Sequence, residues 1–232
     1  MKIFIFAFFL LACSFVAPFV SQAQEGHNFP VLVEMFSSQN CPACPPADAY
    51  MEVLSQSKGV IALSCHIDYF GRTSAGFSKE FCTKRQAAYI KRIGRKSYFT
   101  PQAMVNGHMS EIGYETEKVA ANITKGRSER VNEIKIRLRG SGVYDFKIGA
   151  QKLSHKADLW MAVYDKPHKV NERGRETTYY NVVKNYIPLG QWGGSEISRA
   201  IFPITNFQSA GFVIVAQDHT TGKVLAAGDF KL

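Results

Sequence analysis

The sequence predicts an α/β domain followed by a β-rich, sandwich-like domain. From residue 31 to about 126, short apolar runs typical of buried strands alternate with segments that have helical spacing. From about residue 131, apolar and polar residues alternate over short segments separated by turn signals, and helix signals are scarce. The predicted division is a signal peptide at 1–23, the α/β domain at 24–127 and the β-rich domain at 128–232.

The N-terminus has the features of a secretory signal peptide. Lys2 precedes an almost wholly apolar run at 3–20, and the small residues of Ser21-Gln22-Ala23 fit a cleavage site. Cleavage leaves 232 − 23 = 209 residues and predicts a periplasmic or secreted protein. An uncleaved membrane anchor is one alternative, and a lipid anchor at Cys13 is a minor one because the apolar run continues past it. No later segment is apolar enough to span a bilayer, so no stable membrane span is expected after cleavage.

The first half predicts seven elements in the order β-α-β-α-β-β-α, which is the order of a thioredoxin-like domain. The strands and helices are expected at 31–36, 47–57, 60–68, 77–93, 100–107, around Ile112 and at 115–125. The second half predicts strands at 134–139, 143–148, 157–165, 177–186, 212–218 and 223–230. The predicted fold class is therefore a thioredoxin-like α/β domain followed by a β-sandwich-like domain.

The main functional signal is the CPAC motif at 41–44, which lies between the first strand and the first helix. This spacing allows a small disulfide ring, and the free N–H groups and positive charge at the helix N-terminus stabilise a thiolate. Cys41 is expected to be the exposed, attacking sulfur and Cys44 the resolving sulfur. Because Pro45 favours a helix start directly after Cys44, the helix dipole would act most strongly on Cys44, and the roles of the two sulfurs stay open. A redox-inactive structural disulfide is the alternative.

The second signal is Thr100-Pro101 at the start of the third strand. In thioredoxin-like folds, a cis-proline there faces the cysteine pair and turns the preceding backbone toward an extended substrate. An ordinary trans proline is the alternative. His66, as a charge that tunes the thiolate, and Asp68, as a proton acceptor, are supporting candidates, although both also fit structural roles. Gln102 is a further supporting candidate, for which a structural hydrogen bond is also expected.

Two further cysteines, Cys65 and Cys82, lie in the second strand and in the second helical segment. Their even number in an exported chain favours a second disulfide, while separate burial as small apolar residues is the alternative. The connectivity does not follow from the sequence.

Composition limits the classes of partner. The chain of 232 residues has a formal net charge of +9, but its basic residues are scattered and no nucleic-acid-binding motif accompanies them. Nucleic acid is therefore not an expected partner. No cofactor is expected. The expected partners are protein or small-molecule thiols and disulfides, together with a redox partner in the cell envelope.

The motifs together resemble a secreted bacterial thioredoxin-like family of uncharacterised function, domain of unknown function twelve-twenty-three. The resemblance covers nearly all of the chain after the signal peptide and rests on the signatures CxxCPPAD, HxDY and TPQ. The matching positions are Cys41, Cys44, Pro45, Pro46, Ala47, Asp48, His66, Asp68, Tyr69, Gln86, Thr100, Pro101 and Gln102. The chain departs from the pattern at Cys65, Cys82 and Phe70. The family implies the fold but brings no established substrate.

We therefore expect a thiol–disulfide oxidoreductase that uses Cys41 and Cys44 opposite Pro101. A second class is a copper(I)-binding module in which Cys41, Cys44 and His66 hold the metal, because copper(I) favours thiolate ligands. A third class is a non-catalytic binding protein with a structural disulfide.

Overall fold

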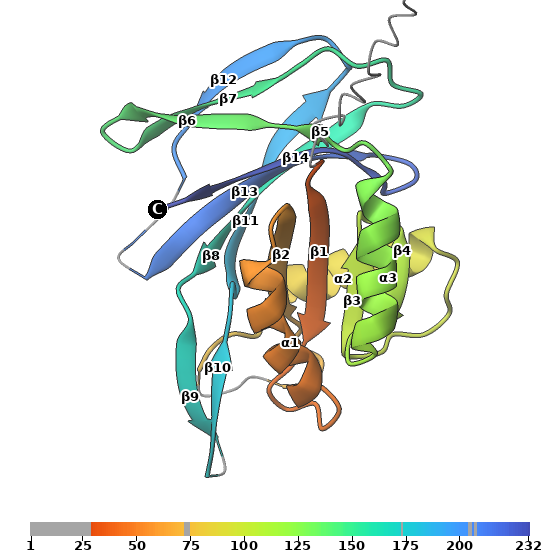
Figure 1. Ribbon diagram of the computed structural model, residues 1–232, viewed down its shortest axis with the longest axis vertical. Helices are drawn as coiled ribbons and strands as arrows, with labels where there is room; N and C mark the ends of the chain where they lie inside the picture. The colour runs from red at the N-terminus through yellow and green to blue at the C-terminus, as the bar shows by residue number, and fades with distance from the viewer. Residues whose placement is uncertain (1–28, 72–74, 173, 204–205, 207) are drawn as a thin grey trace, which may run out of the picture.

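The structure of the protein, a computed structural model, describes residues 29–71, 75–172, 174–203, 206 and 208–232. This part of the chain has a mixed α/β architecture of three helices and several β-sheets (Figure 1). No helix within it is both long and apolar enough to cross a membrane. The predicted signal peptide at 1–23 and Cys13 lie outside the described residues.

The first half contains the seven predicted elements in the predicted order. They are β1 (Val31–Ser37), α1 (Pro45–Gln56), β2 (Val60–His66), α2 (Glu80–Arg92), β3 (Gln102–Val105), β4 (Met109–Ile112) and α3 (Thr116–Arg127). The four strands form one sheet in the order β2-β1-β3-β4, in which β1 is parallel to β2 and antiparallel to β3. Every residue of β1 is buried, because both faces of this central strand are covered.

The two faces of the four-stranded sheet are covered differently. On one face, side chains of α1 and α3 such as Met51 and Val119 pack against Val33 and Met35 of β1. On the other face, Tyr89 of α2 joins a core that also contains Trp160 from the second half of the chain. Figure 1 shows α1 and α3 in front of the sheet and α2 behind it.

The second half is almost entirely β-structure. Its strands are β5 (Asn132–Glu133), β6 (Lys135–Gly140), β7 (Val143–Ile148), β8 (Ala157–Asp165), β9 (His168–Glu172), β10 (Arg175–Tyr179), β11 (Val183–Trp192), β12 (Ile197–Ile201), β13 (Ser209–Asp218) and β14 (Val224–Lys231). A five-stranded sheet, β11-β8-β13-β14-β5, packs against a three-stranded sheet, β12-β7-β6, around a core that includes Phe146, Trp192 and Phe212. The β9–β10 hairpin extends beside α1 (Figure 1).

Two of the differences between the predicted and the observed elements have a clear physical cause. The strand expected at 177–186 is divided between β10 and β11, because Asn181 has a φ of 50° and breaks the extended backbone. Asparagine tolerates this left-handed conformation, and here its side-chain amide also donates to the Ala62 carbonyl at 2.9 Å. The second helix begins at Glu80 rather than at 77, because Lys79 is extended and donates its N–H to the His66 carbonyl.

The residues around Asn181 cover the outer edge of the four-stranded sheet. The Ser64 N–H of β2 donates to the Asn181 carbonyl at 2.9 Å, and Ser64 forms an isolated parallel bridge with Val182. An uncovered strand edge presents free backbone groups to other chains. The second half of the chain therefore pairs with part of the outer edge of β2.

The two halves also share a buried ionic contact. Arg85 of α2 forms a bidentate ion pair with Glu34 of β1, and its guanidinium lies 4.0 Å from the ring centroid of Trp160 of β8. Gln217 of β13 accepts a hydrogen bond from Arg85 at 3.3 Å. The ion pair raises the pKa of Arg85 despite burial, which opposes the shift. The predicted boundary at 127/128 falls between α3 and β5, but the core beneath it is continuous.

Candidate functional site

Cys41 and Cys44 form a disulfide in the connection between β1 and α1, with Cα atoms 5.4 Å apart. As expected from the two prolines, α1 begins at Pro45, Cys44 is its N-cap residue and Cys41 lies in the preceding loop. The Cys44 carbonyl accepts hydrogen bonds from the N–H groups of Ala47 and Asp48 at 2.9 and 3.0 Å. The sulfur pair therefore lies at the positive end of the helix.

The expectation of an exposed Cys41 is wrong. Cys41 is 4% exposed and Cys44 is fully buried, whereas Pro42 and Ala43 between them are exposed. Thr100 covers part of the Cys41 sulfur, because its side-chain oxygen lies 3.3 Å and its carbonyl oxygen 3.7 Å from it. The disulfide is thus recessed, and Cys41 is the residue of the pair that keeps a small exposed fraction.

The segment opposite the disulfide directly precedes β3. The Thr100–Pro101 peptide bond is cis, as expected from the sequence. The Pro101 carbonyl accepts a hydrogen bond from the Gly113 N–H at 2.8 Å, which fixes the end of this segment to the loop after β4. A Cβ atom on Gly113 would lie 3.0 Å from Pro101 and closer still to Met35, so the position has room for glycine alone. Thr100 is in this way held against Cys41.

A buried polar pair lies next to the disulfide and was missed as a site candidate by the sequence analysis. Asp48, in the first turn of α1, is 2% exposed and accepts a hydrogen bond from the Ser37 hydroxyl at 2.6 Å. Ser37 ends β1 and is fully buried. The sequence identified Asp48 as a position that matches the family pattern. Its burial was not predictable, because it results from the packing of α1 on the sheet.

The predicted supporting residue Gln102 belongs to a hydrogen-bond chain behind the Thr100 segment. Its carbonyl accepts from the Gln86 amide at 3.0 Å, and its own amide donates to Ser110 at 2.8 Å. Gln86 also donates to the Phe99 carbonyl and accepts from the Tyr69 hydroxyl at 3.2 Å. The chain of amides holds the 98–101 segment in position, which is a structural role.

His66 does not supply the charge that the sequence analysis assigned to it. It ends β2, is fully buried and contacts the rings of Phe77 and Tyr179, both with centroids 5.4 Å away. Neither ring nitrogen has a hydrogen-bond partner among the described residues. Burial lowers the pKa of His66 to about 3, so the imidazole is neutral at ordinary pH and does not act as a positive charge beside a thiolate.

Asp68 has a partner on another element. Its carboxylate accepts a hydrogen bond from the Thr83 hydroxyl of α2 at 2.5 Å, and its N–H donates to the same oxygen at 3.0 Å. These bonds tie the loop after β2 to α2. The structural alternative for Asp68 accounts for both contacts.

Cys65 of β2 and Cys82 of α2 form the second disulfide, as the cysteine count favoured. Both are buried, at 3% and 0% exposure, and lie in the core that the two halves share. This bond fastens α2 to the face of the sheet opposite α1.

The alternative copper site is not assembled. Among the described residues, no group of three or more His, Cys, Asp or Glu side chains is placed to hold a metal ion. Cys41 and Cys44 are joined to each other, and His66 is enclosed by aromatic rings.

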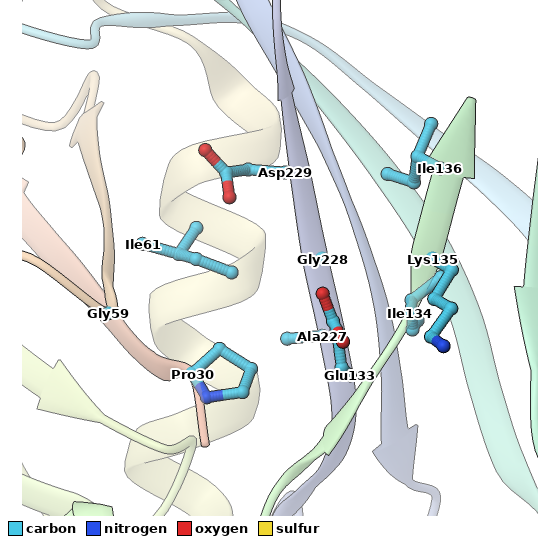
Figure 2. Close-up of a pocket in the computed structure, with 10 residues that line it drawn as sticks. All are labelled: Pro30, Gly59, Ile61, Glu133, Ile134, Lys135, Ile136, Ala227, Gly228 and Asp229. Carbon is cyan, nitrogen blue, oxygen red and sulfur yellow. The ribbon is translucent and has the colours of Figure 1, made fainter. Parts of the chain in front are cut away.

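A cavity of about 400 Å³ lies away from the cysteine pair (Figure 2). Pro30, Gly59 and Ile61 line one side of it, before β1 and at the start of β2, whereas the disulfide follows the opposite end of β1. Ile134 and Asp229, from the second half of the chain, line the other side. The cavity therefore belongs to the junction of the two halves and not to the disulfide site.

Fold and site define a mixed α/β protein with two disulfides, one of them recessed at a helix N-terminus. The chain belongs to the family described as "Protein of unknown function (DUF1223)", whose model matches residues 32–217. It is also similar to a protein from Agrobacterium tumefaciens with an X-ray crystal structure, at 26% sequence identity and a TM-score of 0.75. That similarity covers 90% of this chain and 96% of the other. No curated protein matches the sequence.

Proposed function

We propose that this protein is a thiol–disulfide oxidoreductase that exchanges disulfides through Cys41 and Cys44. The observation that carries the proposal is the cysteine pair itself, bonded at the N-terminus of α1 with Thr100 against Cys41. A helix N-terminus favours the thiolate form of a cysteine, which is the form that attacks and leaves in disulfide exchange.

The first half, by this proposal, is a thioredoxin-like domain. Three features support it: the β-α-β-α-β-β-α order, the sheet order β2-β1-β3-β4 with β3 antiparallel to β1, and a CxxC motif between β1 and α1. The Thr100–Pro101 segment before β3 lies opposite that motif. The β-rich half is a sandwich-like extension that covers the α2 face of the sheet.

The exchange starts from the oxidised pair. A substrate thiolate attacks the Cys41 sulfur, the Cys41–Cys44 bond breaks, and Cys44 leaves as a thiolate. A second substrate thiolate then attacks the substrate sulfur of the mixed disulfide and releases the Cys41 thiolate. Two electrons pass from the substrate dithiol to the protein pair, and the two protons of the substrate thiols are left for Cys41 and Cys44 or solvent. The reverse sequence reduces a substrate disulfide.

Cys41 is the sulfur that exchanges with substrate, and Cys44 is the resolving sulfur. Cys41 keeps a small exposed fraction of 4%, while Cys44 is fully buried. A substrate approaching Cys41 meets Thr100, whose oxygen atoms lie beside the sulfur. This assignment keeps the order of roles that the loop position of Cys41 suggested.

The compartment is part of the proposal. Two disulfides are typical of proteins that fold in an oxidising environment, such as the periplasm or the exterior of the cell. There the reduced pair would be returned to the disulfide by a dithiol–disulfide partner of the envelope.

An insulin-reduction assay and an oxidative refolding assay test the function on the purified protein. The wild-type protein is expected to accelerate at least one of the two reactions, and Cys41→Ser is expected to return it to the uncatalysed rate. In Cys44→Ser, the free Cys41 thiolate should attack a substrate disulfide and release one substrate thiolate, and the mixed disulfide at Cys41 should accumulate because the resolving sulfur is absent. Activity that persists in Cys41→Ser would falsify the proposal, and a mixed disulfide trapped at Cys44 in that variant would reverse the roles.

A further inference from the structure

Three exposed aromatic side chains lie close to the Thr100 side of the recessed disulfide. Tyr69, Phe70 and Tyr98 are 43%, 44% and 51% exposed. They come from two separate segments, which are the loop after β2 and the segment before β3. We call these three side chains the aromatic rim. Large apolar groups that gather on a surface mark a place where another molecule is contacted.

Thr100 connects the rim to the sulfur. The Thr100 side chain approaches the Cys41 sulfur at 3.3 Å and also lies close to the Tyr69 hydroxyl. The Tyr69 ring lies 5.2 Å from Phe70 and 6.0 Å from Tyr98, measured between centroids. The three rings are therefore adjacent, and Thr100 lies between Tyr69 and the Cys41 sulfur.

The same part of the rim is fixed to the loop that carries the cysteines. The side-chain amide of Asn40, the residue before Cys41, donates to the Phe70 carbonyl at 3.1 Å. The rim therefore lies beside the Cys41 loop as well as beside Thr100.

The charges beside the rim are mostly positive. Arg95 and Lys96 are exposed close to Tyr98 along the chain, and neither has an ion-pair partner among the described residues. Arg95 lies over the Phe99 ring at 5.0 Å. The acidic residue beside the rim is Asp68, which precedes Tyr69 and whose carboxylate is bound by the Thr83 hydroxyl. Two cations against one carboxylate make the net charge beside the rim positive, which complements an acidic ligand.

We propose that the aromatic rim selects extended polypeptide segments in which the cysteine is flanked by a large apolar residue and an acidic residue. This inference rests on the proposed function. A recessed sulfur is difficult to reach for a cysteine that lies flat on a folded surface, whereas an extended segment advances about 3.3 Å per residue and sets neighbouring side chains on both sides of the cysteine. A small-molecule thiol reaches the sulfur but contacts none of the rings.

The test uses the oxidised full-length mature protein and single-cysteine peptides. One peptide carries Phe and Glu beside its cysteine, a second carries Lys in place of Glu, and a third carries Ser and Gln. Loss of the Cys41–Cys44 disulfide is followed under excess peptide, and each rate is divided by the rate of that peptide with bis(2-hydroxyethyl) disulfide, which removes differences in thiol reactivity. The Phe and Glu peptide is expected to react about tenfold faster than the Ser and Gln peptide. This ratio corresponds to the free energy of one or two aromatic contacts.

The variants Phe70→Ser and Tyr98→Ser are each expected to lower this ratio about threefold, the size of one weak aromatic contact. Lys96→Glu should shift the preference from the Glu peptide toward the Lys peptide. The matched control is Phe202→Ser, because Phe202 is an exposed aromatic residue, at 70%, outside the rim. The control should keep the wild-type ratio.

A wild-type ratio near one, or a ratio that survives both rim substitutions, would overturn the selection by the rim. Glutathione is tested with the wild-type protein in parallel. If glutathione reduces the Cys41–Cys44 disulfide while the peptides show no preference, exchange holds and the rim proposal fails. If no thiol reduces the pair in the folded protein, the proposed function fails as well.

Discussion

The two disulfides of this protein have the same Cα–Cα distance but different surroundings. Both join cysteines whose Cα atoms are 5.4 Å apart, and each links a residue in or after a strand to a residue in or at the start of a helix. Cys41–Cys44 closes over 3 positions in a loop at a helix N-terminus, with exposed residues between its sulfurs. Cys65–Cys82 closes over 17 positions within the core that the two halves share.

The difference predicts that location decides what each disulfide does. A bond at the start of a helix, with exposed residues between its two cysteines, fits the exchange proposed above. A bond inside an apolar core restricts the unfolded chain and is shielded from other thiols. Three measurements would break or sharpen this comparison.

The largest expected effect is in selective reduction. Under native conditions, a low concentration of dithiol should reduce Cys41–Cys44 long before Cys65–Cys82, because the latter is reached only when the core opens. Alkylation followed by peptide mass mapping should therefore label Cys41 first and leave the core cysteines unlabelled. Early labelling of Cys65 or Cys82 in the folded protein would remove the distinction between the two bonds.

The next effect concerns stability. Cys65→Ala/Cys82→Ala is expected to lower the free energy of unfolding by about 3 kcal/mol, following the loop-closure entropy of a loop near 15 residues. Cys41→Ala/Cys44→Ala removes a much smaller loop and should cost roughly 1 kcal/mol less than that by the same relation. Urea titrations of both double variants and of the wild-type protein measure this. A larger loss for the Cys41 and Cys44 variant would contradict the structural role assigned to the core bond.

The smallest effect concerns His66, which follows Cys65 along β2. Its pKa is about 3 in the folded protein against 6.5 as the reference value, so the unfolded state takes up a proton between these values and stability falls as pH decreases from 6.5. Between pH 7 and pH 5 the loss from this group is about 2 kcal/mol, at about 1.4 kcal/mol per pH unit. His66→Phe should remove that part of the acid sensitivity, measured as urea stability at both pH values.

His219→Gln is the control for this experiment, because the His219 side chain is 63% exposed. It should leave the acid sensitivity close to that of the wild-type protein. An equal loss between pH 7 and pH 5 in His66→Phe and in the wild-type protein would mean that the buried ring does not control the acid response.

The order of elements was predictable from the sequence because it depends on local signals. Apolar runs predicted β1 and β2, and the two prolines predicted the start of α1 and the position of Cys44 as its cap. The second disulfide was favoured, with its connectivity left open, by the even number of cysteines and the predicted export. The division of one predicted strand at Asn181 was not foreseen, because that break depends on a contact with β2, far away along the chain.

The surroundings of the site were less predictable, because they arise from residues distant in sequence. The burial of Cys41 comes from Thr100, which lies 59 positions further along the chain. The neutrality of His66 comes from Phe77 and Tyr179, which enclose it from two other segments. A motif identifies which residues have the right chemistry, but packing decides their exposure and charge.

The core that α2 shares with the β-rich half has a consequence for dissecting the protein. Leu32 and Phe36 of β1 share a core with Trp160 and Val213, so removal of everything after α3 would expose an apolar surface of the four-stranded sheet to water. The same truncation would remove the tryptophan ring that covers the Arg85 guanidinium. We therefore expect that the half that carries Cys41 and Cys44 does not fold stably by itself, and that its chemistry requires the whole protein.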